Sequence, residues 1–155
     1  MAQSITNPGT RLAGLLAVQT GLTLHDRIMR GNYDWIESEL IERKFPVTAD
    51  QEGDWRWKLF PFDRNISFEK AIMLMKEDGY DAGQIGHILT FGEKYPEEQR
   101  KYPIVGPGSV TWLGLHRVVP VLWGDGGSRG LDLSWIGDDW GDGCRLFGVR
   151  RRSFA

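Results

Sequence analysis

The sequence predicts an α+β domain in which N-terminal helices and a capped helical hairpin pack on a small, mainly antiparallel, Trp-rich sheet. Three observations favour this fold. The last third of the chain, 102–152, has four short apolar stretches separated by Gly/Asp turns, as a sheet of short strands does. Residues 55–59 alternate apolar and cationic side chains. Two segments, 67–77 and 81–91, combine helix-capping residues with a helical apolar spacing.

Helices are expected in the first third of the chain. Residues 1–9 are polar, contain a turn-forming Asn-Pro-Gly, and are expected to be mobile. The leucine spacing of 10–21, closed by a glycine, predicts a short helix. Thr23 and Asp26 match a capping box and open a second helix. The remainder of this helical part, which extends over 10–46, is interpreted as irregular or helical.

A loop and a strand follow. Residues 47–54 are polar and are expected to form the loop. In the next five residues the period of two predicts a strand with one face in the core. The apolar side chains Trp55, Trp57 and Leu59 are expected to face the core, and the cationic side chains Arg56 and Lys58 to face water.

The helical hairpin is predicted from two sets of caps. Ser67 is a good N-cap for the first helix, which is expected to end at Gly79. Asp81 and Gln84 match a second capping box, and the second helix is expected to end at Gly92. A short glycine-containing turn between two capped helices also resembles a helix-turn-helix in sequence. A polar helical turn follows the hairpin.

Four strands are predicted near the C-terminus, at 103–105, 117–123, 130–136 and 144–150. Glycine and aspartate clusters between the last three favour two hairpins. Pro120 assigns its strand to an edge or bulged position, because proline cannot donate to a ladder. Cys144 is expected to be a buried and unreactive strand residue, with both faces of its strand covered. The expected core consists of Trp57, Phe68, Ile72, Met75, Ile85, Leu89, Val119, Leu131, Trp135 and Phe147.

Composition sets further bounds. The chain has 155 residues, which suits a single domain, 1–155, with an α+β core at 55–152. Its one cysteine cannot form an internal disulfide, which favours a reducing compartment. The N-terminus lacks a secretory pattern and no stretch has the length of a membrane span, so we expect a cytoplasmic protein that does not bind membranes. The net charge of −2 provides no general attraction for polyanions.

The sequence shows no recognisable catalytic, metal-binding or cofactor-binding signature, and it therefore favours a protein that is not an enzyme and has no cofactor. The three histidines lie on separate predicted elements, at His25, His87 and His116. Four aspartates near the C-terminal turns do not have the spacing of an EF-hand and are interpreted as turn residues: Asp125, Asp138, Asp139 and Asp142.

The leading functional hypothesis is a binding module that meets a protein or a small polar ligand. Tryptophan and arginine are typical anchors of binding surfaces, and four of them lie near the Gly/Asp turns of the predicted sheet. These candidate residues are Trp123, Arg129, Trp140 and Arg145. The competing interpretation is that all seven tryptophans belong to the core.

The alternative function is nucleic-acid binding by the 67–91 hairpin together with the C-terminal arginines. Its candidate residues are Gln84, His87, Arg150, Arg151 and Arg152. The second helix has no arginine or lysine before Lys94, although phosphate contacts supply most of the affinity for nucleic acid. This charge pattern disfavours the alternative, and a helical hairpin packed on a sheet explains the same residues.

A longer pattern lies in 79–152. It includes Lys94–Val105, which reads KYPEEQRKYPIV, then Gly108-Ser109, and a close that contains VPVL, a tryptophan and RLFGVR. This stretch resembles a family of uncharacterised conserved bacterial proteins, and departs from it at Gly106-Pro107 and at Leu146–Gly148. The resemblance implies a bacterial origin and carries no established activity. The terminal strand also resembles the end of C-type-lectin-like and sulfatase-modifying-factor-like domains, which favours a binding scaffold.

Overall fold

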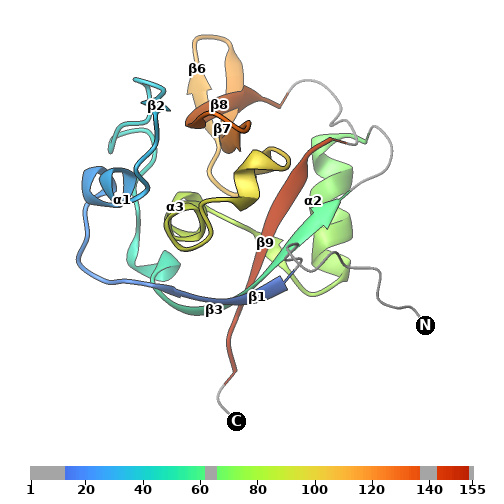
Figure 1. The fold of residues 1–155 in the computed structure, drawn as a ribbon. Coiled ribbons are helices and arrows are strands. Elements are labelled where there is room, and N and C mark those ends of the chain that lie inside the picture. The colour runs from blue at the N-terminus through green and yellow to red at the C-terminus, as the bar shows by residue number, and fades with distance from the viewer. Residues whose placement is uncertain (1–12, 62–65, 137–142, 154–155) are drawn as a thin grey trace.

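The computed structural model describes residues 13–61, 66–136 and 143–153 (Figure 1). The predicted mobile segment 1–9 lies outside these residues. The strands are β1 (Ala13–Val18), β2 (Trp35–Ile36), β3 (Gly53–Pro61), β4 (Asp81–Ala82), β5 (Ile104–Val105), β6 (Thr111–Leu113), β7 (His116–Gly124), β8 (Arg129–Trp135) and β9 (Arg145–Arg151). The α-helices are α1 (Leu24–Arg30), α2 (Phe68–Glu77) and α3 (Ile85–Lys94). Two 3₁₀ turns, η1 (Ala49–Gln51) and η2 (Glu98–Arg100), complete the order.

The predicted fold class is wrong, because a large sheet dominates the described chain. The sheet has nine strands in the order β1-β3-β9-β5-β7-β8-β2, with β4 beside β9 and β6 beside β7. Most pairs are antiparallel, but β5 with β9 and β2 with β8 are parallel. The sheet is therefore large and mixed rather than small, and the three α-helices of the described residues pack against it.

The predicted first helix is instead the edge strand β1. Leu16 and Val18 are buried and lie two residues apart, as the period of a strand requires. Gly14 lies opposite Trp57 on β3, and a Cβ on Gly14 would come within 3.0 Å of the indole ring. The absent side chain lets the indole lie against the strand, so long-range packing outweighs the local leucine spacing.

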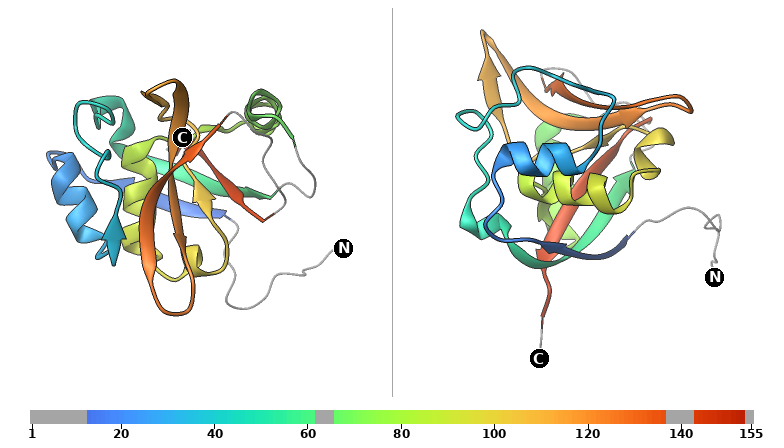
Figure 2. Two further views of the ribbon diagram at one scale, coloured as in Figure 1. Left: turned by 90° about the horizontal axis from the view of Figure 1, so that it is seen from above. Right: turned by 60° about the vertical axis from the view of Figure 1, so that its left-hand side comes forward.

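The predicted helical hairpin is also wrong. Residues Asp81 and Ala82, expected to open the second helix, form β4 on β9, so α3 begins at Ile85 with Gln84 as its N-cap. The chain thus crosses the sheet between α2 and α3. Figure 2 shows the two helices on opposite faces, with the sheet curved around α3.

Strand β9 separates the two halves of the core. Leu146 packs with the α2 side, whereas Phe147 and Val149 pack with the α3 side. Both faces of β9 are buried, as predicted. On the α3 side Trp57 is fully buried, with its ring centroid 4.8 Å from that of Phe91 and 6.0 Å from that of Phe147. This aromatic cluster fills the concave face of the sheet.

Several local predictions are confirmed. Thr23 and Asp26 form the capping box of α1, and the Ser67 side chain caps α2. Strand β3 buries Trp55, Trp57 and Leu59. The four C-terminal strands occur as β5, β7, β8 and β9. Of the expected core residues Phe68 and Ile72 are half-buried, and Trp135, the last residue of β8, is 49% exposed and contacts the exposed ring of His116.

Two predictions about single residues need correction. Pro120 is not on an edge strand, since β7 pairs with β8 on one side and with β5 and β6 on the other. The backbone of Pro120 faces the gap between β5 and β6. Its carbonyl accepts a hydrogen bond from the Gly106 N–H there, and no neighbouring carbonyl requires a donor from the proline nitrogen. Cys144 precedes β9 and is half-buried rather than buried. No helix in the described ranges is long and apolar enough to cross a membrane.

The buried guanidinium of Arg129 joins separate parts of the fold. Arg129 is 5% exposed and donates to the carbonyls of Gly31 and Gly92, at 2.6 and 3.0 Å. Gly31 caps the C-terminus of α1, and Gly92 lies in the last turn of α3. A third bond, 2.9 Å long, reaches Oε1 of Gln99, which itself donates to carbonyls on β7 and β8.

We predict that Arg129→Met lowers the free energy of unfolding by at least about 3 kcal/mol, because it leaves several buried acceptors without a donor. Urea denaturation measures the loss. The matched control Arg43→Met removes a cation from an exposed loop position and should shift stability by less than about 0.5 kcal/mol. Equal effects of the two substitutions would contradict the role assigned to Arg129.

Candidate functional site

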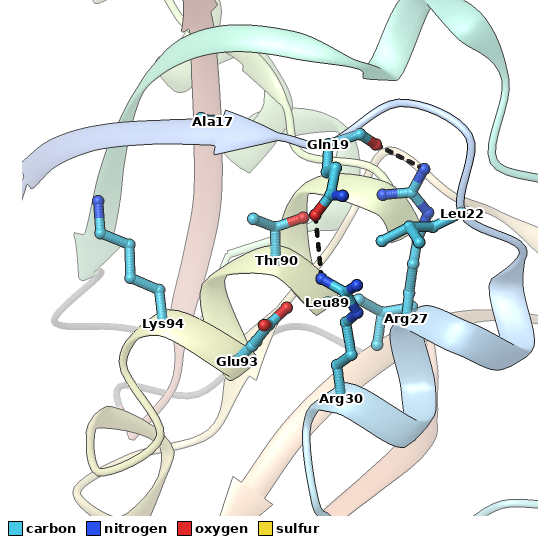
Figure 3. Close-up of a pocket in the computed structure, with 9 residues that line it drawn as sticks. All are labelled: Ala17, Gln19, Leu22, Arg27, Arg30, Leu89, Thr90, Glu93 and Lys94. Carbon is cyan, nitrogen blue, oxygen red and sulfur yellow. Dashed lines mark hydrogen bonds between the residues drawn. The ribbon is translucent and has the colours of Figure 1, made fainter.

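A cleft of about 280 Å³ opens between β1, α1 and α3 (Figure 3). We call it the α1–α3 cleft. The side chains that line it are Ala17, Gln19, Leu22, Arg27, Arg30, Leu89, Thr90, Glu93 and Lys94. Leu22 and Leu89 give it an apolar part, and the remaining surface is mostly charged or hydrogen bonding.

The α1 wall carries two arginines with different roles. They are three residues apart on a helix whose start is fixed by the capping box, so they lie on one face. Arg27 is 3% exposed and donates to the Gln19 carbonyl at 2.9 Å and to the Glu52 carboxylate at 3.1 Å. Arg30 is exposed and donates to the Gln19 side-chain oxygen at 3.0 Å. Arg27 therefore supports the wall, while Arg30 presents its charge to the cleft.

The α3 wall presents Thr90, Glu93 and Lys94, which share one face through their i, i+3 and i+4 spacing. The Thr90 hydroxyl donates to the Gly86 carbonyl at 2.8 Å, which leaves its oxygen able to accept. Lys94 extends toward β1, where Nζ donates to the Leu15 carbonyl at 3.1 Å. In Figure 3 Lys94 stands at one end of the cleft and the arginines at the other, with Thr90 and Glu93 between them.

Three of these charges lack an ionic partner. Seven ion pairs occur among the described residues, and none of them includes Arg30, Lys94 or Glu93. The two cations have only neutral oxygens as hydrogen-bond partners. The cleft thus offers two cationic donors, one carboxylate and one hydroxyl to a ligand. Its lining contains no thiol or imidazole, so its chemistry is that of charge recognition.

The structure does not bring together the three predicted binding residues that it describes. Trp123 is half-buried, with its ring centroid 5.3 Å from that of Trp35. Arg145 lies over the Tyr102 ring at 4.3 Å. Arg129 is buried, and its guanidinium donates to carbonyls at the ends of α1 and α3. It is therefore not available to a ligand at the surface. Trp140 lies outside the described residues.

Trp123 does line a second hollow of about 360 Å³, which also contains the half-buried Cys144. The interpretation that every tryptophan belongs to the core is wrong as well, since Trp112 and Trp135 are 60% and 49% exposed.

The nucleic-acid candidates are separated too. Gln84 caps α3, and His87 is 1% exposed inside the concave face. Arg150 is exposed on the other face of the sheet, where its guanidinium lies 5.5 Å from the Tyr80 ring. Arg151 stacks on Trp55 and donates to the carbonyls of Asp50 and Glu52, while the Arg152 backbone donates to Asp54. Because neighbouring strand residues point to opposite faces, Arg150 and Arg151 lie on different faces of the sheet, and only Arg151 lies on the side of α3.

The aspartates behave as predicted where they are described. The Asp125 carboxylate accepts from the backbone of Gly127 and Ser128, and these bonds lower the pKa of Asp125. Asp138, Asp139 and Asp142 lie outside the described residues. Within the described residues, no group of three or more histidine, cysteine, aspartate or glutamate side chains is placed to hold a metal ion.

Sequence reasoning missed the cleft residues. The Arg27–Arg30 spacing on a capped helix is visible in the sequence. The sequence, however, predicts a helix where β1 lies and starts the second hairpin helix before α3 begins. It therefore places no element opposite these two arginines. A scan against family models and searches of curated proteins and of solved structures found no match. The cleft is therefore interpreted from its own chemistry.

His87 gives the fold a dependence on pH. Its Nδ1 accepts from the Gln84 backbone at 2.9 Å, so the neutral ring carries its proton on Nε2. Burial lowers the pKa of His87 to about 4 from an ordinary value of 6.5, and the positive charge of Arg151 adds to the effect. The folded state therefore holds the ring neutral at pH values where the unfolded chain would protonate it.

We predict that stability is lost as the pH falls from about 6.5 to about 4, because protons bind the unfolded state more tightly. The shift corresponds to about 3 kcal/mol. His87→Asn keeps an acceptor for the Gln84 backbone and cannot titrate. Denaturation midpoints at pH 7 and pH 4 should therefore fall less for the variant than for the wild type, and parallel losses would contradict the assignment.

Proposed function

We propose that this protein is a binding module whose α1–α3 cleft takes a small molecule bearing both carboxylate and ammonium groups, as an α-amino acid does. The observation that carries the proposal is the set of unpaired charges in the cleft, with Arg30 and Lys94 at its two ends and Glu93 between them. A binding module was also the leading expectation from the sequence, but at different residues.

The charges favour this ligand class over a plain anion. Arg30 offers a guanidinium that can bind a carboxylate through two donors, and Lys94 offers a point charge. Glu93 would repel a simple dicarboxylate and attract an ammonium group. A ligand with two carboxylates and one ammonium group complements all three side chains, so acidic amino acids are the best match within the class.

The size of the cleft supports a small ligand. Its volume of about 280 Å³ lies just below the roughly 300–1,000 Å³ of pockets for drug-sized molecules. Arg30, Glu93 and Lys94 are all exposed, so a ligand can reach them without any opening of the fold.

We predict that isothermal titration calorimetry detects binding of L-glutamate, and weaker binding of glutarate, which has the same two carboxylates without the amine. Arg30→Gln should weaken glutamate binding at least tenfold, since a hydrogen bond to a charged group contributes about 1.5–3 kcal/mol. Glu93→Gln should remove the preference for glutamate over glutarate.

Arg43→Gln is the matched control, because it removes one cation from an exposed position outside the cleft. It should leave glutamate binding unchanged. Absence of heat at millimolar glutamate, or equal weakening by the Arg30 and Arg43 variants, would overturn the proposal.

A further inference from the structure

The β6–β7 hairpin, which stands at the top of Figure 1, exposes large apolar side chains. Trp112 is 60% exposed, Leu115 is 91% exposed and Val110 is 41% exposed. Tryptophan is a frequent anchor of protein interfaces. This surface lies outside the α1–α3 cleft and has no role in the function proposed above.

The hairpin also leaves a strand edge open. Among the described strands β6 pairs only with β7, through Thr111 with Val118, Trp112 with Arg117 and Leu113 with His116. The two strands are joined by Gly114-Leu115, and the φ of +61° at Gly114 suits the first central position of a type II′ turn. Leu113 and His116 close this turn and face each other. The N–H and C=O of Trp112, one residue earlier, therefore point to the open edge.

This edge lacks the protection that proteins usually give to such strands. Natural edges are blunted by lysine, proline, bulges or a covering element. Residues 108–115 read GSVTWLGL, with no charge and no proline. The combination of β-branched and aromatic residues on an uncharged edge is a template for pairing with another strand.

We propose that β6 pairs antiparallel with β6 of a second copy, about a two-fold axis that passes beside Trp112. A two-fold axis at this position sets Trp112 opposite its equivalent and Thr111 opposite Leu113. Every such pair is uncharged, so the edge complements itself without a like-charge penalty, and the tryptophans form a cross-strand aromatic pair. A partner strand of another protein would need a matching apolar pattern that the second copy already provides.

The available area sets the strength of the dimer. One buried aromatic side chain removes about 150–250 Å² from water. Because Trp112 is only 60% exposed in the monomer, it and its apolar neighbours supply at most a few hundred Å² per copy, less than the roughly 800 Å² per partner of a standard interface. We therefore expect a weak, reversible dimer whose population rises with protein concentration.

Sedimentation velocity between about 1 and 300 μM tests the proposal. The wild type should change from the monomer mass of 17.6 kDa to twice that mass as concentration rises. Trp112→Lys, which sets two positive charges opposite each other, should stay monomeric at every concentration. The matched control Trp135→Lys changes an exposed tryptophan of β8 that is not on the open edge, and should still dimerise.

The register is tested by a cross-link. Trp112→Cys in a Cys144→Ser background should form an intermolecular disulfide on mild oxidation, because directly opposite Cα atoms lie about 4.5–5.5 Å apart. Leu115→Cys in the same background lies off the axis and should cross-link less. A wild type that stays at 17.6 kDa at the highest concentration, or a Trp112→Lys variant that dimerises as the wild type does, would overturn the proposal.

Discussion

The arrangement of this fold depends on one buried charge, the guanidinium of Arg129. Moving an arginine out of water is costly unless its donors are satisfied. Here Nη1 and Nη2 meet carbonyls at the C-terminal ends of α1 and α3, where the helix dipoles are negative, whereas the buried Nε has no hydrogen-bond partner among the described residues. No carboxylate of the described residues binds this guanidinium. The ring centroid of Tyr33 lies 4.8 Å from the guanidinium carbon. The bonds hold two helices from distant parts of the chain against the start of β8, and these helices form two walls of the α1–α3 cleft.

The chemistry of the cleft depends on which of its charges have ionic partners within the fold. Arg27 and Arg30 lie on the same face of α1, but only Arg27 reaches Glu52 and becomes part of the wall. Arg30 is left with a neutral partner, as is Lys94 across the cleft. Arg27, Arg30 and Arg129 therefore differ in role because of their partners. Arg27 forms an ion pair with Glu52, Arg129 binds backbone carbonyls and Gln99 inside the fold, and Arg30 keeps its charge available. The proposed ligand site consists of side chains that the fold itself does not use.

The sequence predicted those features that are set by neighbours in the chain. The caps of α1 and α2 and the alternation of β3 each lie within a few residues, and the structure has them. Strand β4 could not be predicted, since two residues pair with a strand more than sixty positions later. The same holds for β1, where the leucine spacing permits a helix and only the contact of Trp57 with Gly14 selects a strand.

The burial of Arg129 could not be predicted for the same reason. Arg129 beside a Gly/Asp turn has the appearance of a surface anchor, and its burial depends on Gly31 and Gly92, which are far away in sequence. The residues that surround Arg129 are therefore not its neighbours in the sequence. The most direct test of the account is an NMR titration of ¹⁵N-labelled protein with L-glutamate. Saturable amide shifts confined to 17–30 and 89–94 are predicted, and shifts centred instead on Trp123 and Arg145, or none at all, would contradict it.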